Sequence, residues 1–222
     1  MSSEEIFTAI QVNDKDAVAA LLESTPDLAR ARSNAGISAL MMAIYQNRTE
    51  IADLLRDAAG DLDLYEAAAV GDLPRLQALL TQDATQVNSP SPDGFTALHL
   101  ACFFRQLEAA QMLLAAAADA NAVSPNRIAV IHSAAASREA AIVKLVLAAG
   151  ANPNVQQQGG FTALQSAAAH NNVEMVQALL DAGADRSIRS DDGLTAAELA
   201  AKQAAKEAAD LLGSAEHHAA AG

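Results

Sequence analysis

Aromatic side chains are scarce in this sequence, and tryptophan is absent. Aromatic residues make up only 3% of the chain, whereas alanine is by far its commonest residue. A core made mostly of alanine and leucine requires closely packed helices, because alanine fills little space. The single cysteine, Cys102, excludes an intrachain disulfide framework and a cysteine-based zinc site.

Positive charge is also in short supply. The chain has 14 Lys and Arg against 27 Asp and Glu, which gives a formal net charge of −13. Such a chain repels phosphate backbones, so we expect no nucleic-acid partner. No stretch approaches the roughly 18 apolar residues of a membrane span. The acidic start MSSEEIF also lacks the basic region of a secretory signal. These absences predict a cytoplasmic protein with no membrane contact.

One short motif recurs along the chain. The segments at 94–101 (GFTALHLA), 160–167 (GFTALQSA) and 193–200 (GLTAAELA) are visibly related, and a weaker copy lies at 127–134 (RIAVIHSA). Earlier copies lie at 36–43 (GISALMMA) and, in degenerate form, at 63–67. A fixed period of this length is the sequence pattern of a repeat protein. The last alanines of four successive copies recur at one constant spacing: Ala101, Ala134, Ala167 and Ala200.

Each repeat predicts two short helices. Thr162, three positions before Gln165, matches the capping box that starts a helix. Residues 173–180 then place apolar side chains at helical spacing, and Gly183 follows as a C-cap. Asp-Gly and Gly-Gly steps between the units supply the positive φ of a tight turn. Stacking would bury the apolar face that a single unit leaves open.

These residues resemble the ankyrin repeat, a unit of about 33 residues with a Gly-x-Thr-Pro-Leu-His-x-Ala core. The run at 93–104 (DGFTALHLACFF) and the high alanine content point to bacterial members of that family. The resemblance implies an all-α solenoid of six to seven helix pairs with short β-hairpin or loop tips. We expect a single domain at residues 1–213 and a flexible C-terminal tail at residues 214–222.

Some units depart from the family pattern. Ala67 follows Ala43 nine positions earlier than the period requires, which predicts a missing hairpin between the second and third units. We therefore expect a shortened link at residues 57–63, with a kink or hinge there. Arg127 stands at a glycine position, which predicts a non-standard turn before the fifth unit. By the same register, Tyr65 falls on the family's histidine position.

No catalytic motif accompanies the repeats. The sequence contains no Gly-rich phosphate loop, no HExxH, no CxxC and no GxSxG. His99 and His132 fall on the repeat's own histidine position, where the resemblance implies a hydrogen bond to neighbouring backbone. We therefore expect a non-enzymatic protein without cofactor or metal.

The few aromatic residues gather on one face of the expected solenoid. The resemblance implies a concave face built from hairpin tips and the exposed side of the first helices, and five of the seven Phe and Tyr residues fall there. Exposed apolar patches and aromatic anchors are typical of protein interfaces. The alternative is that these rings pack on neighbouring hairpins and helices. The predicted partner-binding residues are Tyr45, Phe95, Phe103, Phe104, Phe161 and His170.

The sequence therefore favours a protein–protein interaction module that binds its partner on the concave face. The acidic net charge favours a basic partner. One alternative is an immunity or regulatory protein that inhibits a basic enzyme or toxin. Another is a structural or self-associating spacer, although we expect a monomer.

Overall fold

A computed structural model describes residues 3–214, which form seven successive pairs of short helices. The prediction of an all-α solenoid is confirmed, and the upper of the two expected numbers of pairs is right. Two short 3-10 helices, η1 (Pro26–Arg30) and η2 (Ala84–Asn88), follow the first and third pairs. The pairs are α1 (Ser3–Gln11) with α2 (Lys15–Ser24), α3 (Ala39–Tyr45) with α4 (Thr49–Ala59), α5 (Leu64–Val70) with α6 (Leu73–Gln82), α7 (Ala97–Phe103) with α8 (Leu107–Ala115), α9 (Val130–Ala136) with α10 (Ala140–Ala148), α11 (Ala163–Ala169) with α12 (Val173–Asp181), and α13 (Ala196–Lys202) with α14 (Lys206–Ser214).

The first helix of most pairs begins at a side-chain cap. Thr96, Thr162 and Thr195 each accept a hydrogen bond from the backbone N–H three positions on, as the sequence predicts. Ser38 and Asp63 cap α3 and α5 in the same way. The caps at Asp63 and Thr96 are one full period apart, whereas the caps at Ser38 and Asp63 lie closer together than that.

This cap register corrects two predictions about the third pair. Ala68, five positions after the Asp63 cap, is the true equivalent of Ala101, so the chain is eight rather than nine positions short. Glu66, not Tyr65, occupies the family's histidine position, and its carboxylate accepts the Asp63 N–H at 2.9 Å. Asp63 is a better cap than either neighbour, which shifts the helix start by one position.

Short tips precede the fourth and fifth pairs, and they share one turn. In the first, the Ser91 N–H donates to the Phe95 carbonyl and the Gly94 N–H donates to the Ser91 carbonyl, both at 2.8 Å. Ser124, Ile128 and Arg127 repeat these two bonds at 2.9 Å. The expectation of a non-standard turn at Arg127 is therefore wrong, because Arg127 adopts the positive φ (61°) that glycine has elsewhere. An isolated antiparallel bridge between Val123 and Ala129 closes that tip.

The row of tips skips the third pair. An added Cβ on Gly94 would lie 2.4 Å from the Pro125 ring in the next tip, so these tips stack closely. An added Cβ on Gly36 would lie 2.8 Å from Pro92, which is the position equivalent to Pro125 one repeat earlier. The tip before α3 therefore stacks directly on the tip before α7, with α5 and α6 contributing no tip between them.

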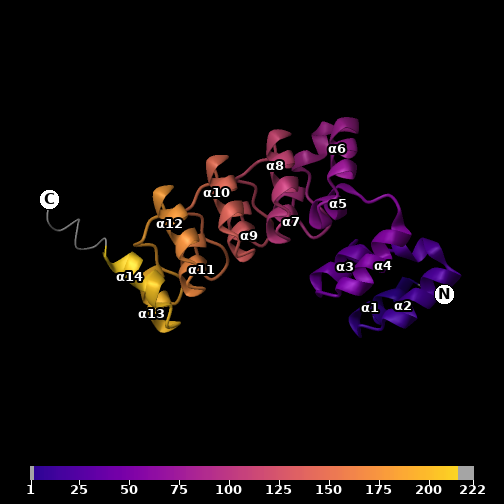
Figure 1. The fold of residues 1–222 in the computed structure, drawn as a ribbon, viewed down its shortest axis with the longest axis horizontal. Coiled ribbons are helices and arrows are strands. Elements are labelled where there is room, and N and C mark those ends of the chain that lie inside the picture. The colour runs from indigo at the N-terminus through magenta and orange to yellow at the C-terminus, as the bar shows by residue number, and fades with distance from the viewer. Residues whose placement is uncertain (1–2, 215–222) are drawn as a thin grey trace.

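The direction of the helix row changes at the shortened link. Figure 1 shows α5 to α14 in a regular row, whereas α1 to α4 lie turned relative to it. The link itself is held from both sides: Arg30 donates to the Ala59 carbonyl at 3.0 Å and Arg75 donates to the Leu62 carbonyl at 2.7 Å. Leu62, a link residue, is only 1% exposed and belongs to the main core.

One apolar core runs through the described residues from α1 to α14. The repeated alanines Ala101, Ala134 and Ala200 are fully buried, which agrees with close approach of neighbouring first helices. A small second cluster of Met41, Ala69 and Leu100 lies on the tip side of α3, α5 and α7. None of the described helices is long and apolar enough to cross a membrane. The tail expected at residues 214–222 lies outside the described residues except for Ser214, which ends α14.

Candidate functional site

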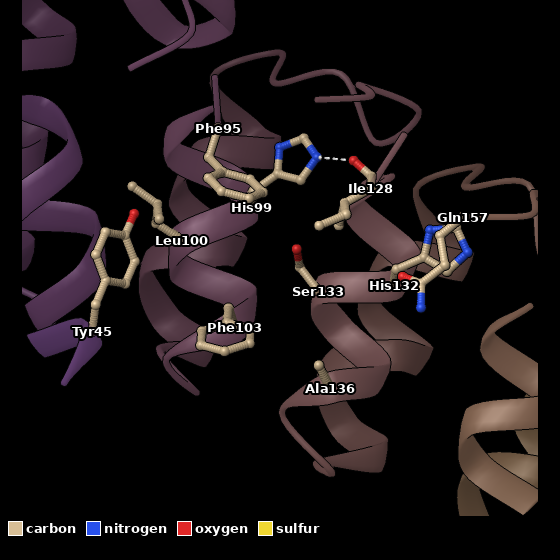
Figure 2. A pocket seen from close by; sticks show the side chains of 10 residues that line it. All are labelled: Tyr45, Phe95, His99, Leu100, Phe103, Ile128, His132, Ser133, Ala136 and Gln157. Atoms are coloured by element: carbon tan, nitrogen blue, oxygen red, sulfur yellow. Dashed lines mark hydrogen bonds between the residues drawn. The ribbon is translucent and has the colours of Figure 1, made fainter. Parts of the chain in front are cut away.

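An apolar pocket of about 230 Å³ opens between α7 and α9, on the face formed by the tips and the first helices. We call this surface the tip face. Figure 2 shows the side chains that line the pocket, with Tyr45 from α3 on one side and α9 on the other. The lining residues are Tyr45, Phe95, His99, Leu100, Phe103, Ile128, His132, Ser133, Ala136 and Gln157.

The pocket is made by the same four repeat positions taken twice. The tip residue and three positions on α7 are Phe95, His99, Leu100 and Phe103, and their equivalents one repeat later are Ile128, His132, Ser133 and Ala136. The hollow arises because α9 carries serine and alanine where α7 carries leucine and phenylalanine. A difference in side-chain size between two copies of the repeat therefore shapes the site.

The structure brings together four of the six residues predicted to bind a partner. Tyr45, Phe95 and Phe103 line the pocket, and Phe103 is 46% exposed. Phe104 lies behind them, half-buried, with its ring 5.9 Å from that of Tyr45 and 5.0 Å from that of Phe103. Phe104 is thus more a packing residue than the exposed anchor that the register suggested.

The other two predicted residues lie outside the pocket. Phe161 is half-buried at the next tip, where its ring would contact a Cβ placed on Gly159. His170 is exposed at the end of α11, and its Nδ1 bonds to the Ser166 carbonyl at 2.8 Å. Neither side chain is brought to Tyr45, Phe95 or Phe103.

Sequence reasoning did not assign several of the pocket residues. Ile128 and Ala136 hold the same register positions as Phe95 and Phe103, so a comparison of side-chain size between neighbouring repeats would have found the hollow. Gln157 stands one full period after Ser124, on the tip before α11, so the same comparison would have found a larger side chain there.

The two pocket histidines form hydrogen bonds with backbone groups. The His99 Nε2 lies 3.0 Å from the Ile128 carbonyl (Figure 2), and its Nδ1 accepts the Thr96 N–H at 3.3 Å. His132 repeats this with Val155 at 2.9 Å and the Ala129 N–H at 3.0 Å. Both rings are neutral in this arrangement, with the proton on Nε2. Burial lowers the pKa of both imidazoles. These rings therefore have no nitrogen free for acid–base chemistry.

Burial also disfavours ionisation of two other side chains, Tyr45 and Cys102. Burial, together with the hydrogen bond from its hydroxyl to the Asp93 carboxylate, raises the pKa of Tyr45. Burial also raises the pKa of the Cys102 thiol to about 12, which leaves almost no thiolate at neutral pH. Within residues 3–214, no three His, Cys, Asp or Glu side chains gather into a metal site.

Acidification is expected to destabilise the protein in part through His99 and His132. Their folded pKa values lie below the usual value of about 6.5, so the unfolded chain binds more protons than the folded one. The stability that the neutral rings contribute is complete above about pH 6.5 and decreases as the pH falls from there through the lowered folded pKa values.

The chain itself offers the variant that tests this prediction. Gln165 stands at the equivalent position and makes the same two bonds, accepting the Thr162 N–H at 2.8 Å and donating to the Leu194 carbonyl at 2.7 Å. The double variant His99→Gln with His132→Gln should lose less unfolding free energy between about pH 7 and pH 5 than the wild type. Urea titrations at the two pH values measure it, and equal losses would contradict the prediction.

The stacked helix pairs of residues 3–214 define a repeat protein, and a ring-lined hollow opens between α7 and α9. Comparison with known families identifies the repeat. A family model of three ankyrin repeats matches residues 131–220, and a model of a single ankyrin repeat matches residues 93–125. The chain belongs to the ankyrin-repeat family. Ankyrin repeats are generally non-enzymatic modules, and the repeats of this chain indicate a module for protein–protein interaction.

Two relatives show how far the similarity extends. The chain is 33% identical over 124 residues to a probable E3 ubiquitin-protein ligase XBOS31 of Oryza sativa subsp. japonica, which covers 51% of this chain and 28% of that protein. It is 30% identical over 112 residues to alpha-latrocrustotoxin-Lt1a of Latrodectus tredecimguttatus, covering 47% of this chain and 8% of that protein. The chain thus matches only a small part of these longer proteins. The expectation of a bacterial type finds no support, since the similarity to the rice protein shows that the same pattern occurs outside bacteria.

Proposed function

We propose that this chain binds a partner protein on the tip face, with the pocket between α7 and α9 as the centre of the interface. The observation that carries the proposal is Phe103, a large apolar side chain that is 46% exposed at the pocket wall. Tyr45 is 36% exposed beside it. Exposed aromatic side chains next to a hollow are typical anchors of protein interfaces.

The partner is proposed to be basic. This chain is proposed to be a monomer that binds the partner in the cytoplasm. The net charge of −13 supports a basic partner, because opposite charge speeds association. The expected absence of catalysis rests on the pocket histidines, whose ring nitrogens are both engaged by backbone groups. The two alternatives from the sequence, an inhibitor of a basic enzyme and a self-associating spacer, differ from this proposal in partner identity and in solution mass.

Replacement of Phe103 by Ala is expected to weaken partner binding at least tenfold. Truncation of a central aromatic anchor typically costs about 2 kcal/mol or more of binding free energy, and about 1.4 kcal/mol is tenfold in affinity. The measurement is quantitative capture of the partner from native-host extract, followed by calorimetry with the purified partner at low and high salt. Light scattering on the free chain reads its mass against 22.9 kDa.

The matched control is Val12→Ala, which removes an even more exposed apolar side chain beyond the end of α1. It should leave partner affinity unchanged. Unaltered affinity for Phe103→Ala, or equal loss for both variants, would reject the tip face as the interface. A solution mass that is a multiple of the mass of one chain would favour the spacer.

A further inference from the structure

Two polar side chains in the pocket have no hydrogen-bond partner among residues 3–214. Ser133 is 4% exposed, and Figure 2 shows its hydroxyl pointing from α9 into the hollow. Gln157 also reaches the pocket, and only its backbone takes part in the hydrogen bonds of its tip. Both side chains line the hollow, and Gln157 is half-buried, so a polar group of an occupant can bond to either of them.

The remaining walls are apolar and uncharged. The rings of Tyr45, Phe95 and Phe103 stand on one side, and Ile128 and Ala136 complete the other. None of the lining residues is Asp, Glu, Lys or Arg, and both histidines are neutral. An occupant that enters this hollow must therefore be uncharged, because burial of a charge without a counter-charge is costly.

The size of the pocket limits the occupant to one side chain. Sites for drug-sized ligands and cofactors occupy about 300–1,000 Å³, whereas this hollow measures about 230 Å³. Aromatic walls favour an aromatic occupant through edge-to-face contacts. An aromatic side chain with one polar group would also satisfy the Ser133 hydroxyl or the Gln157 amide.

We propose that the pocket receives one tyrosine or tryptophan side chain of the partner protein, with Ser133 and Gln157 as its hydrogen-bonding residues. This inference rests on the proposed function and names the partner chemistry of the same site. The segment that carries the aromatic residue is expected to be neutral or basic, because the chain that receives it carries a net charge of −13.

The test uses three blocked amino acids as probes: N-acetyl-tyrosinamide, N-acetyl-tryptophanamide and N-acetyl-phenylalaninamide. Titration of the full chain, followed by amide NMR shifts, should give millimolar dissociation constants for the first two. The shifts should be confined to the pocket residues on α3, α7 and α9 and to the tips before α7, α9 and α11. The phenylalanine derivative should bind three- to tenfold more weakly, because it leaves the polar groups of the pocket unsatisfied.

Three variants sharpen the test. Ser133→Ala should reduce the preference for tyrosine over phenylalanine, because only Gln157 then remains to bond the hydroxyl, whereas Ser166→Ala should leave the preference intact. Ser166 is the matched control because it holds the same position on α11 and lies outside the pocket. Ala136→Phe repeats the Phe103 side chain on α9, and it should fill the hollow and remove probe binding without lowering the thermal midpoint.

Several outcomes would overturn the proposal. Equal binding of the tyrosine and phenylalanine derivatives by the wild type would show that Ser133 and Gln157 do not recognise the occupant. Tighter binding of free tyrosine than of its blocked amide would assign the pocket to a small metabolite. Absence of probe binding, with partner binding that still depends on Phe103, would reject the pocket but keep the proposed function. Probe binding without any partner that depends on Phe103 would reject the proposed function while the pocket chemistry stands.

Discussion

Replacement of Leu62 by Ala should lower the unfolding free energy by about 2–5 kcal/mol, although this residue lies in a link between helices. Leu62 is 1% exposed and belongs to the main apolar core. Because no tip covers the junction between α4 and α5, this side chain is the chief apolar contact that the link supplies. The loss should be seen in urea titrations followed by circular dichroism.

The position of Leu62 also predicts where the protein loosens. Hydrogen exchange in the Leu62→Ala variant should accelerate in α1 to α4 more than in α9 to α14, because the junction separates these segments. The control is Leu113→Ala, a fully buried residue of α8 within the regular row. It should cost a similar free energy without that bias toward the N-terminal helices. A loss below about 1 kcal/mol for Leu62→Ala would contradict the packing role assigned to the link.

Replacement of Ala101 by Leu is expected to cost about 1–3 kcal/mol of unfolding free energy through overpacking. Ala101 lies on α7, which packs against α5 on one side and α9 on the other, and it is fully buried. Three additional carbon atoms at this point would force neighbouring first helices apart. The denaturant midpoint measures the effect.

The matched substitution is Ala141→Leu, which adds the same atoms at an exposed position of α10. It should change the midpoint little, because its new side chain meets solvent. If Ala101→Leu and Ala141→Leu had equal effects, helix propensity rather than close packing would explain the regular spacing of alanines in this chain.

The repeat made the regular part of the fold predictable. The caps at Thr96, Thr162 and Thr195 and the buried Ala101 lie where the period places them. Each of these copies begins its first helix with the same threonine cap, so the helix starts and the buried positions recur with the sequence. The third pair was misplaced by one position, because Ala67 was taken as its repeated alanine, whereas one full period counted back from Ala101 reaches Ala68. The cap at Asp63, one full period before Thr96, agrees with Ala68.

The site was less predictable than the fold. The register placed Tyr45, Phe95 and Phe103 on the correct face, because exposure along a helix follows from its period. It missed Ser133, which lines a cavity that arises because α9 carries serine and alanine where α7 carries leucine and phenylalanine. It also treated Phe104 as an exposed anchor, because the register gives no sign that Tyr45 would approach from two pairs away.

The shortened link shows how chain length at a repeat boundary can shape a surface of the solenoid. In a uniform array, Tyr45 would lie two repeats from Phe104, and helices pack about 8–10 Å apart. With the chain shortened between the caps Ser38 and Asp63, the tip at Gly36 meets Pro92, and the Tyr45 hydroxyl reaches Asp93 at the edge of the hollow. The shorter spacing at this repeat boundary thus supplies a wall of the pocket that substitution within a single repeat would not provide. Repeat arrays can therefore diversify their interfaces through chain length as well as through side chains.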